Sequence, residues 1–198
     1  MAGSVVLKGL RHVWVTLDQL GFPLALMGGL ALSIWKHVRA TRDIDLLISL
    51  GQADVEFVLA ELSRAGIRTK HQPPVLDLHS VRIIQLLYEP PESFTDLQID
   101  LLLVESEYHE RALARRVSAH VAEIDLDIQV LSCEDLVLHK LIAGRIIDKA
   151  DAVALLRANR KTLDLGYLSS WVSRLQLDSE WFEIRREAFG DEPTPGAN

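Results

Sequence analysis

The sequence has few of the features that mark several classes of protein. Cys133 is the single cysteine among 198 residues, which excludes an internal disulfide and a cysteine-only zinc site. No apolar run approaches the roughly 18–20 residues that span a membrane. The N-terminal residues do not read as a signal peptide. These features predict a cytoplasmic protein that does not associate with membranes.

Basic charge is also scarce. The chain has 21 Lys and Arg residues against 28 Asp and Glu residues, a net charge of −7. Nucleic-acid binders usually carry a basic excess, because neutralising phosphates supplies much of their affinity. Any contact with RNA therefore needs a local patch. Residues 134–163 are a candidate, with six basic and four acidic groups.

What remains is ordinary globular composition, 48% hydrophobic and 25% charged. Residues 1–131 alternate between helical periodicity and apolar strand-like runs, whereas residues 132–189 are helical throughout. We therefore expect a strand-containing core over 1–131, a helical subdomain over 132–189 and a disordered tail over 190–198. Helices are predicted at 4–20, 30–36, 53–65, 105–117, 133–143, 148–158, 164–175 and 178–188, and strands at 24–27, 44–50, 67–70, 81–88, 97–104 and 124–130.

Three aspartates stand in or beside apolar strands. Asp43 and Asp45 are two residues apart at a strand start, so alternation points both carboxylates to one side, with backbones about 7 Å apart. The run Leu97–Leu103 is apolar except for Gln98 and Asp100. A buried, unpaired carboxylate is costly, and a shared Mg²⁺ would remove that cost. The alternatives to a metal site are that Asp43 and Asp45 form a turn at the strand start and that Asp100 pairs with an arginine.

Gly28 and Gly29 lie between a predicted strand and a predicted helix. Glycines let backbone N–H groups approach a phosphate closely, and a helix N-terminus favours negative charge. Taken alone, the pair indicates only a tight turn. Together with the carboxylates it predicts a site that holds a triphosphate between a glycine turn and a divalent metal.

The spacing of these residues resembles a known family. Gly28-Gly29, thirteen intervening residues, Asp43-Ile44-Asp45 and a later strand Asp100 are similar to the DNA-polymerase-β-type nucleotidyltransferase superfamily. The run GGLALSIWKHVRATRDIDLLI is most similar to the AbiEii-like and MenT-like minimal nucleotidyltransferases of bacterial toxin–antitoxin systems. The helical segments around Ser132–Leu136 and Lys140–Asp151 fit as well, so the resemblance covers about residues 20–157.

The resemblance implies an α/β (α+β) fold in which helices flank a mixed, twisted sheet and a C-terminal helical bundle follows. It implies transfer of a nucleoside monophosphate from an NTP to a hydroxyl acceptor, a tRNA 3′ end or a protein, with release of pyrophosphate. It also implies a cognate antitoxin. Asp43, Asp45 and Asp100 would be catalytic and would hold two Mg²⁺, and Gly28, Gly29, Arg39, Lys140 and Arg145 would bind the nucleotide phosphates.

Several alternatives stay open. The acidic composition also suits a nucleotidyltransferase acting on a cationic small molecule of the aminoglycoside type. Many relatives carry Ser or Thr at or after the glycine pair, where this chain has Gly29 and Leu30, so a non-catalytic nucleotide-binding module is a third possibility. Lys140 and Arg145 are nearly as well explained as the solvated face of a helix. We interpret Asp148 first as a helix cap. Cys133 lies at a predicted helix start, a position that favours a somewhat acidic thiol.

Overall fold

The computed structural model describes residues 2–78, 81–91 and 93–190. The predicted tail at 190–198 falls, apart from Gly190, outside the described residues. The chain divides into two compact units, of which the first comprises residues 1–31 and 39–131 and the second residues 32–38 and 132–198. None of the described helices has the length and apolar character that crossing a membrane requires.

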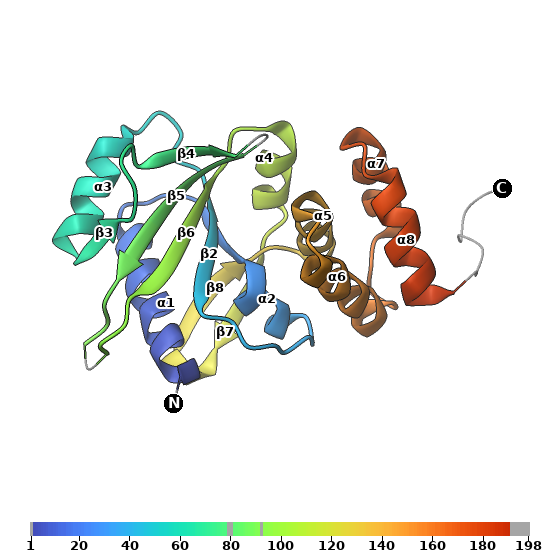
Figure 1. The fold of residues 1–198 in the computed structure, drawn as a ribbon, viewed down its shortest axis with the longest axis horizontal. Coiled ribbons are helices and arrows are strands. Elements are labelled where there is room, and N and C mark those ends of the chain that lie inside the picture. Colours follow the sequence, from blue (N-terminus) through green and yellow to red (C-terminus); the bar gives the residue numbers. More distant parts are fainter. Residues whose placement is uncertain (1, 79–80, 92, 191–198) are drawn as a thin grey trace. The chain divides into compact units, whose positions relative to one another are not determined.

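The strands of the described residues form one mixed sheet in the first unit (Figure 1). Its order is β3-β5-β6-β2-β1-β8-β7, and β4 also pairs with β5. β2 and β6 run parallel at its centre, as do β1 and β8, while the other pairs are antiparallel. The strands are β1 (Leu24–Met27), β2 (Asp43–Ile48), β3 (Ile67–Thr69), β4 (Val75–Leu78), β5 (Val81–Tyr88), β6 (Leu97–Leu103), β7 (Val117–Val121) and β8 (Leu126–Val130).

Helices of the first unit cover the apolar face of this sheet. On β2 and β6, Ile44 and Ile99 are fully buried. Helix α1 (Ala2–Gln19) packs there so closely that a side chain at Gly9 would meet the tip of Leu97. His12 of α1 hydrogen-bonds the carbonyl oxygen of Ala65, at the end of α3 (Val55–Arg64). Because strand side chains alternate, the residues between these apolar positions emerge on the opposite face.

The remaining elements of the first unit are short. Helix α4 (Glu107–Ala114) follows β6 and is capped by Ser106, whose hydroxyl accepts from the backbone N–H of His109. The 3₁₀ turn η1 (Ala122–Ile124) joins β7 to β8. Helix α2 (Gly28–Ile34) begins in the first unit, and its last residues group with the second.

The described secondary structure of the second unit is helical. It contains α5 (Cys133–Ala143), α6 (Ile146–Asn159), α7 (Leu165–Arg174) and α8 (Asp178–Phe189). Ser132 caps α5 by accepting from the backbone N–H of Asp135. Cys133 is 2% exposed, and burial, aided by the charge of Glu134, raises the pKa of its thiol to about 12. The expectation of a somewhat acidic thiol is therefore wrong.

Two strands were missing from the sequence prediction. Val75–Leu78 (β4) is a short strand that shares the outer edge of β5 with β3. Val117–Val121 (β7) follows a helix that ends at Ala114 instead of Val117. With these additions, the mixed α/β sheet flanked by helices agrees with the predicted fold class.

Candidate active site

The register of the central strands brings the three aspartates to one face of the sheet. Asp45 of β2 is the direct partner of Asp100 on β6, and Asp43 is the partner of Gln98. Asp43 is exposed, whereas Asp45 and Asp100 are half-buried. Adjacent parallel strands therefore present carboxylates side by side, as the alternation argument predicted for Asp43 and Asp45.

The glycine turn packs directly against Asp45. Gly28 has φ +63°, and a Cβ atom built on it would lie 1.8 Å from Oδ2 and 2.7 Å from Cβ of Asp45. Met27, the residue before it, is the strand partner of Asp45. A glycine at position 28 is therefore required both by the backbone conformation and by the close approach.

A hydroxyl lies beside the second glycine. A Cβ atom on Gly29 would lie 2.7 Å from Oγ1 of Thr41. The sequence shows Leu30 where relatives place Ser or Thr, and Ser33 as the nearest hydroxyl along the chain. The fold instead brings Thr41 to the turn from twelve residues further on. Sequence reasoning missed this residue because its closeness depends on how the chain returns into β2.

Asp100 is surrounded by amides. Nε2 of Gln98 donates to both carboxylate oxygens at 3.0 and 3.2 Å, and Nε2 of Gln85 donates to Oδ1 at 3.1 Å. Burial raises the pKa of Asp100, the charge of Asp43 adds to the rise, and the hydrogen bonds from the two glutamines and the charge of Lys70 oppose it. The arginine partner considered for Asp100 is replaced by two glutamines. Each is an uncharged polar residue at a half-buried position of a mostly apolar strand, which is the signal that could have revealed them.

The predicted phosphate ligands of the second unit bind carboxylates. Nζ of Lys140, 6% exposed, lies 2.8 Å from Oδ1 of Asp148 and 2.8 Å from Oδ2 of Asp151. Nε of Arg145 lies 2.5 Å from Asp148. Burial tends to raise the pKa of Asp148, but hydrogen bonds from Arg145 and Lys140 outweigh it and lower the pKa. Lys140 is thus not on a solvated face, and Asp148 orients both cations instead of only capping α6.

Arg39, the remaining predicted phosphate ligand, lies on the connection between α2 and β2. Its Nη1 donates to the carbonyl oxygen of Ala40 at 3.2 Å. Arg39 therefore belongs to the same stretch of chain as Thr41 and precedes Asp43 by four residues.

A pocket of about 580 Å³ opens where β2 and β6 begin. Its volume lies in the range of small-molecule sites, about 300–1,000 Å³. Asp43 and Gln98 link it to the carboxylate face, and apolar and polar groups share its lining. The other lining residues are Val5, Val6, Arg42, Leu87, Ser93, Thr95, Asp96 and Leu97.

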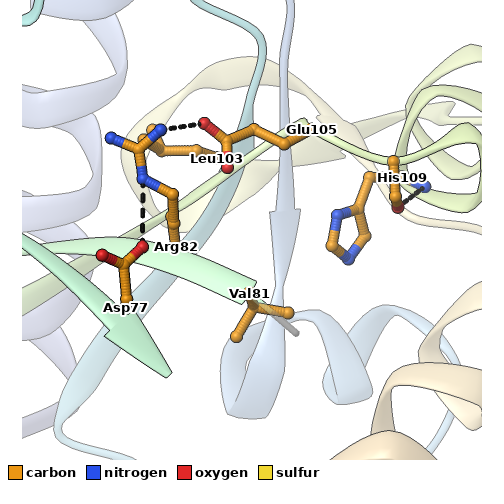
Figure 2. Close-up of a pocket in the computed structure, with 7 residues that line it drawn as sticks. Asp77, Val81, Arg82, Leu103, Glu105 and His109 are labelled. Carbon is orange, nitrogen blue, oxygen red and sulfur yellow. Dashed lines mark hydrogen bonds and ion pairs between the residues drawn. The ribbon is translucent and has the colours of Figure 1, made fainter. Parts of the chain in front are cut away.

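A second pocket, of about 240 Å³, lies at the opposite end of β6 (Figure 2). Arg82 closes one side of it, with Nε 3.3 Å from Asp77 and Nη1 2.5 Å from Glu105. His109 lines another side, and burial lowers its pKa. None of the predicted site residues lines this pocket, and its arginine is already held by two carboxylates, so we do not place the active site there.

The carboxylate face suits a divalent metal in its donor chemistry, because hard cations prefer carboxylate oxygens. The absence of a side chain at Gly28 leaves a space beside Asp45 that any other residue at this position would fill. In the described residues, however, no three His, Cys, Asp or Glu groups are gathered as a metal site.

Solved structures define the class to which this fold belongs. The chain is similar to an antigenic nucleotidyltransferase-like protein from Paracoccidioides brasiliensis, with 16% identity, a TM-score of 0.50 and coverage of 94% of this chain and 97% of that one. It is also similar to the antibiotic-resistance factor ANT(2'')-Ia, with 14% identity, a TM-score of 0.56 and coverage of 94% and 99%. At these identities the likeness shows the fold, which is that of nucleotidyltransferases.

The family follows from the sequence itself. The model of the family described as nucleotidyl transferase AbiEii toxin, type IV toxin–antitoxin system, matches residues 13–194, and the chain belongs to this family. No curated protein matches it significantly. The resemblance inferred from the glycine and aspartate spacing is confirmed, and the chain is a nucleotidyltransferase enzyme.

Proposed function

We propose that this enzyme transfers a nucleoside monophosphate from a Mg²⁺-bound NTP to a hydroxyl of RNA, such as a tRNA 3′ end, as the toxin of a bacterial toxin–antitoxin pair. The observation that carries the proposal is the shared face of Asp43, Asp45 and Asp100, bordered by the glycine turn on one side and by the 580 Å³ pocket on the other. A cognate antitoxin is the expected protein partner.

The glycine turn, Thr41 and the three aspartates have separate roles in the proposed reaction. The N–H groups of the glycine turn and the hydroxyl of Thr41 bind phosphate oxygens. Asp43, Asp45 and Asp100 would hold divalent metal, which when bound would neutralise the triphosphate and steady the attacking and leaving oxygens. Asp100 accepts the proton of the acceptor hydroxyl. The hydroxyl oxygen bonds to the α-phosphorus while the bond from that phosphorus to pyrophosphate breaks.

The pocket supports an RNA acceptor over an aminoglycoside. A polycationic substrate needs several carboxylates for its ammonium groups. In this pocket the carboxylates are Asp43, assigned to metal, and Asp96, which pairs with Arg68 at 2.7 Å. Arg42 adds positive charge suited to a phosphate, and the apolar walls suit the flat face of a base.

An exposed aromatic ring adjoins the same pocket. Phe94 is 99% exposed and stands in sequence between Ser93 and Thr95, two of the lining residues. Aromatic side chains stack on the bases of single-stranded RNA. A single-stranded RNA end therefore matches both the pocket and its surroundings.

The test is a transfer assay with each α-³²P-labelled NTP in turn, offered with total bacterial RNA, total protein or an aminoglycoside, with and without Mg²⁺. We expect label on RNA that depends on Mg²⁺ and is lost in Asp43→Ala and Asp45→Ala, with Asp77→Ala of the Arg82 pocket as the matched control. Label on protein or on the aminoglycoside instead would reject the RNA acceptor. NTP binding without any product would reject catalysis.

A further inference from the structure

Lys70 and His71 hydrogen-bond the two glutamine side chains that hold Asp100. Asp100 is the strand partner of Gln85, and Gln98 lies two residues earlier on the same face of β6. Nζ of Lys70 donates to Oε1 of Gln98 at 2.6 Å, and Nε2 of His71 lies 2.9 Å from Oε1 of Gln85. Two chains of hydrogen bonds, Lys70–Gln98 and His71–Gln85, therefore converge on one carboxylate.

The chemistry of lysine fixes the direction of the first chain. An ammonium group has three donors and no acceptor, so it can face only the oxygen of the Gln98 amide. The nitrogen of that amide must then point to Asp100, which accepts. Without Lys70 the amide can rotate and present its oxygen to the carboxylate, which is repulsive. The backbone N–H of Lys70 donates to the carbonyl oxygen of Gln85 at 2.9 Å, so the segment is anchored beside both glutamines.

The two oxygens of Asp100 are consequently not equivalent. Oδ1 accepts from both Gln85 and Gln98, at 3.1 and 3.0 Å, whereas within the described part of the chain Oδ2 has only the longer contact of 3.2 Å with Gln98. The more heavily bonded oxygen fixes the rotation of the carboxylate. The other keeps lone pairs for a metal or for the proton of the acceptor.

We propose that Lys70 and His71 are positioning residues for the transfer reaction, acting through the amides of Gln98 and Gln85 to hold Asp100 with Oδ2 directed to the reacting groups. The inference rests on the proposed role of Asp100. It assigns no contact with substrate to Lys70, even though Lys70 is an exposed cation on a face where phosphates are expected to bind.

A double-mutant cycle separates a positioning role from direct phosphate binding. Gln98→Met removes the amide at nearly constant volume, and Lys70→Met removes the donor behind it. Residues that orient catalytic ligands typically contribute 10–100-fold. We expect kcat to fall about 10-fold in Lys70→Met and about 10–100-fold in Gln98→Met. KM for the NTP should be unchanged. The loss in the double variant should be clearly smaller than the two single losses combined, because Lys70 acts mainly through that amide and its charge adds only a lesser direct effect on Asp100.

Three further variants complete the test. Lys70→Arg keeps a donor and should retain most of kcat, and Lys8→Met, an exposed lysine on α1, is the matched control for loss of charge. Gln98→Asn, whose shorter amide cannot reach both neighbours, replaces Gln98→Met if thermal melting shows that variant to be unfolded. Mn²⁺ titration of the nucleotide-free protein gives a readout besides activity, and both single variants should weaken Mn²⁺ binding to a similar extent.

Each outcome either supports or overturns the positioning role of Lys70. Additive losses in the double variant, a change confined to KM, or an unchanged kcat in Lys70→Met would overturn the positioning role. Asp100→Asn distinguishes this failure from failure of the proposed function. If Asp100→Asn still transfers nucleotide at the wild-type rate, the role of Asp100 itself is wrong. If it is inactive while the cycle is additive, only the inference about Lys70 falls.

Discussion

Replacing Gly28 by alanine tests the glycine turn, because the structure sets two separate penalties at this position. The first is conformational: φ of +63° is unfavourable for a residue with a Cβ atom by roughly 1–2 kcal/mol. The second is steric. Turning the carboxylate of Asp45 relieves the 1.8 Å overlap with Oδ2, but the 2.7 Å contact with Cβ of Asp45 remains, so the backbone must shift.

Gly21→Ala is the matched control for the first penalty. Gly21 has φ +77° with nothing within 4 Å of an added Cβ atom. We expect it to lose about 1 kcal/mol of unfolding free energy, which in a chain of this length lowers Tm by about 2–4 °C. Gly28→Ala adds an overpacking cost of about 1–3 kcal/mol, so its Tm should fall clearly further.

Activity separates the two variants more sharply. The shift forced by Gly28→Ala moves the turn relative to Asp45, and a misplacement near 1 Å costs on the order of 100-fold in rate. Pyrophosphate release should therefore fall about 100-fold in Gly28→Ala and remain at the wild-type level in Gly21→Ala. Equal melting temperatures for the two variants, or full activity in Gly28→Ala, would refute the reasoning.

Three further predictions concern charge and hydroxyl groups. Burial raises the pKa of Asp100, so the folded state favours the protonated form, and that stabilisation is lost as pH rises through the folded pKa. Asp100→Asn should therefore melt above the wild type at pH 7, with the gap closing in acid, while transfer is abolished; a lower Tm at pH 7 would contradict this. Lys140→Met leaves Asp148 and Asp151 buried without their ammonium and should cost about 3–5 kcal/mol in urea unfolding. Unchanged stability would instead indicate that this lysine serves the substrate. Thr41→Val should weaken Mg²⁺–NTP binding by about 10–100-fold in calorimetry, the equivalent of one hydrogen bond to a charged group. Thr41→Ser should bind as the wild type does, and equal affinities for all three proteins would remove the hydroxyl from the site.

The sequence predicted most elements of the fold because their apolar patterns are long. The strands at 24–27 and 81–88 and the helix at 133–143 coincide with the observed bounds. Val75–Leu78 was missed because a four-residue strand behind two prolines has no periodicity to read. Val117–Val121 was missed because the preceding helix stops at the cap residue Arg115 without a glycine to mark its end.

For the candidate site, the sequence predicted residues that share one strand, residues that stand out as charges in an apolar strand, such as Asp100, and residues given by the family's spacing. Strand alternation was enough to place Asp43 and Asp45 on one face. The contact of Thr41 with the glycine turn and the pairing of Lys70 with Gln98 depend on how distant segments return to the sheet, which no local pattern records. The environment of Lys140 likewise depends on the turn that brings α6 back along α5, so periodicity alone could not distinguish a buried ion pair from a solvated face.

The membership of residues 32–38 in the second unit has a consequence for dissecting this enzyme. Leu32 is fully buried, His37 lies 3.1 Å from Asp151, and Nδ2 of Asn159 donates to the carbonyl oxygen of Trp35. The polypeptide therefore passes between the units three times, and no single cut yields two self-contained pieces. A fragment ended at Leu131 would keep the three aspartates and the glycine turn. It would also carry, between the turn and Asp43, a segment deprived of the helices it packs with.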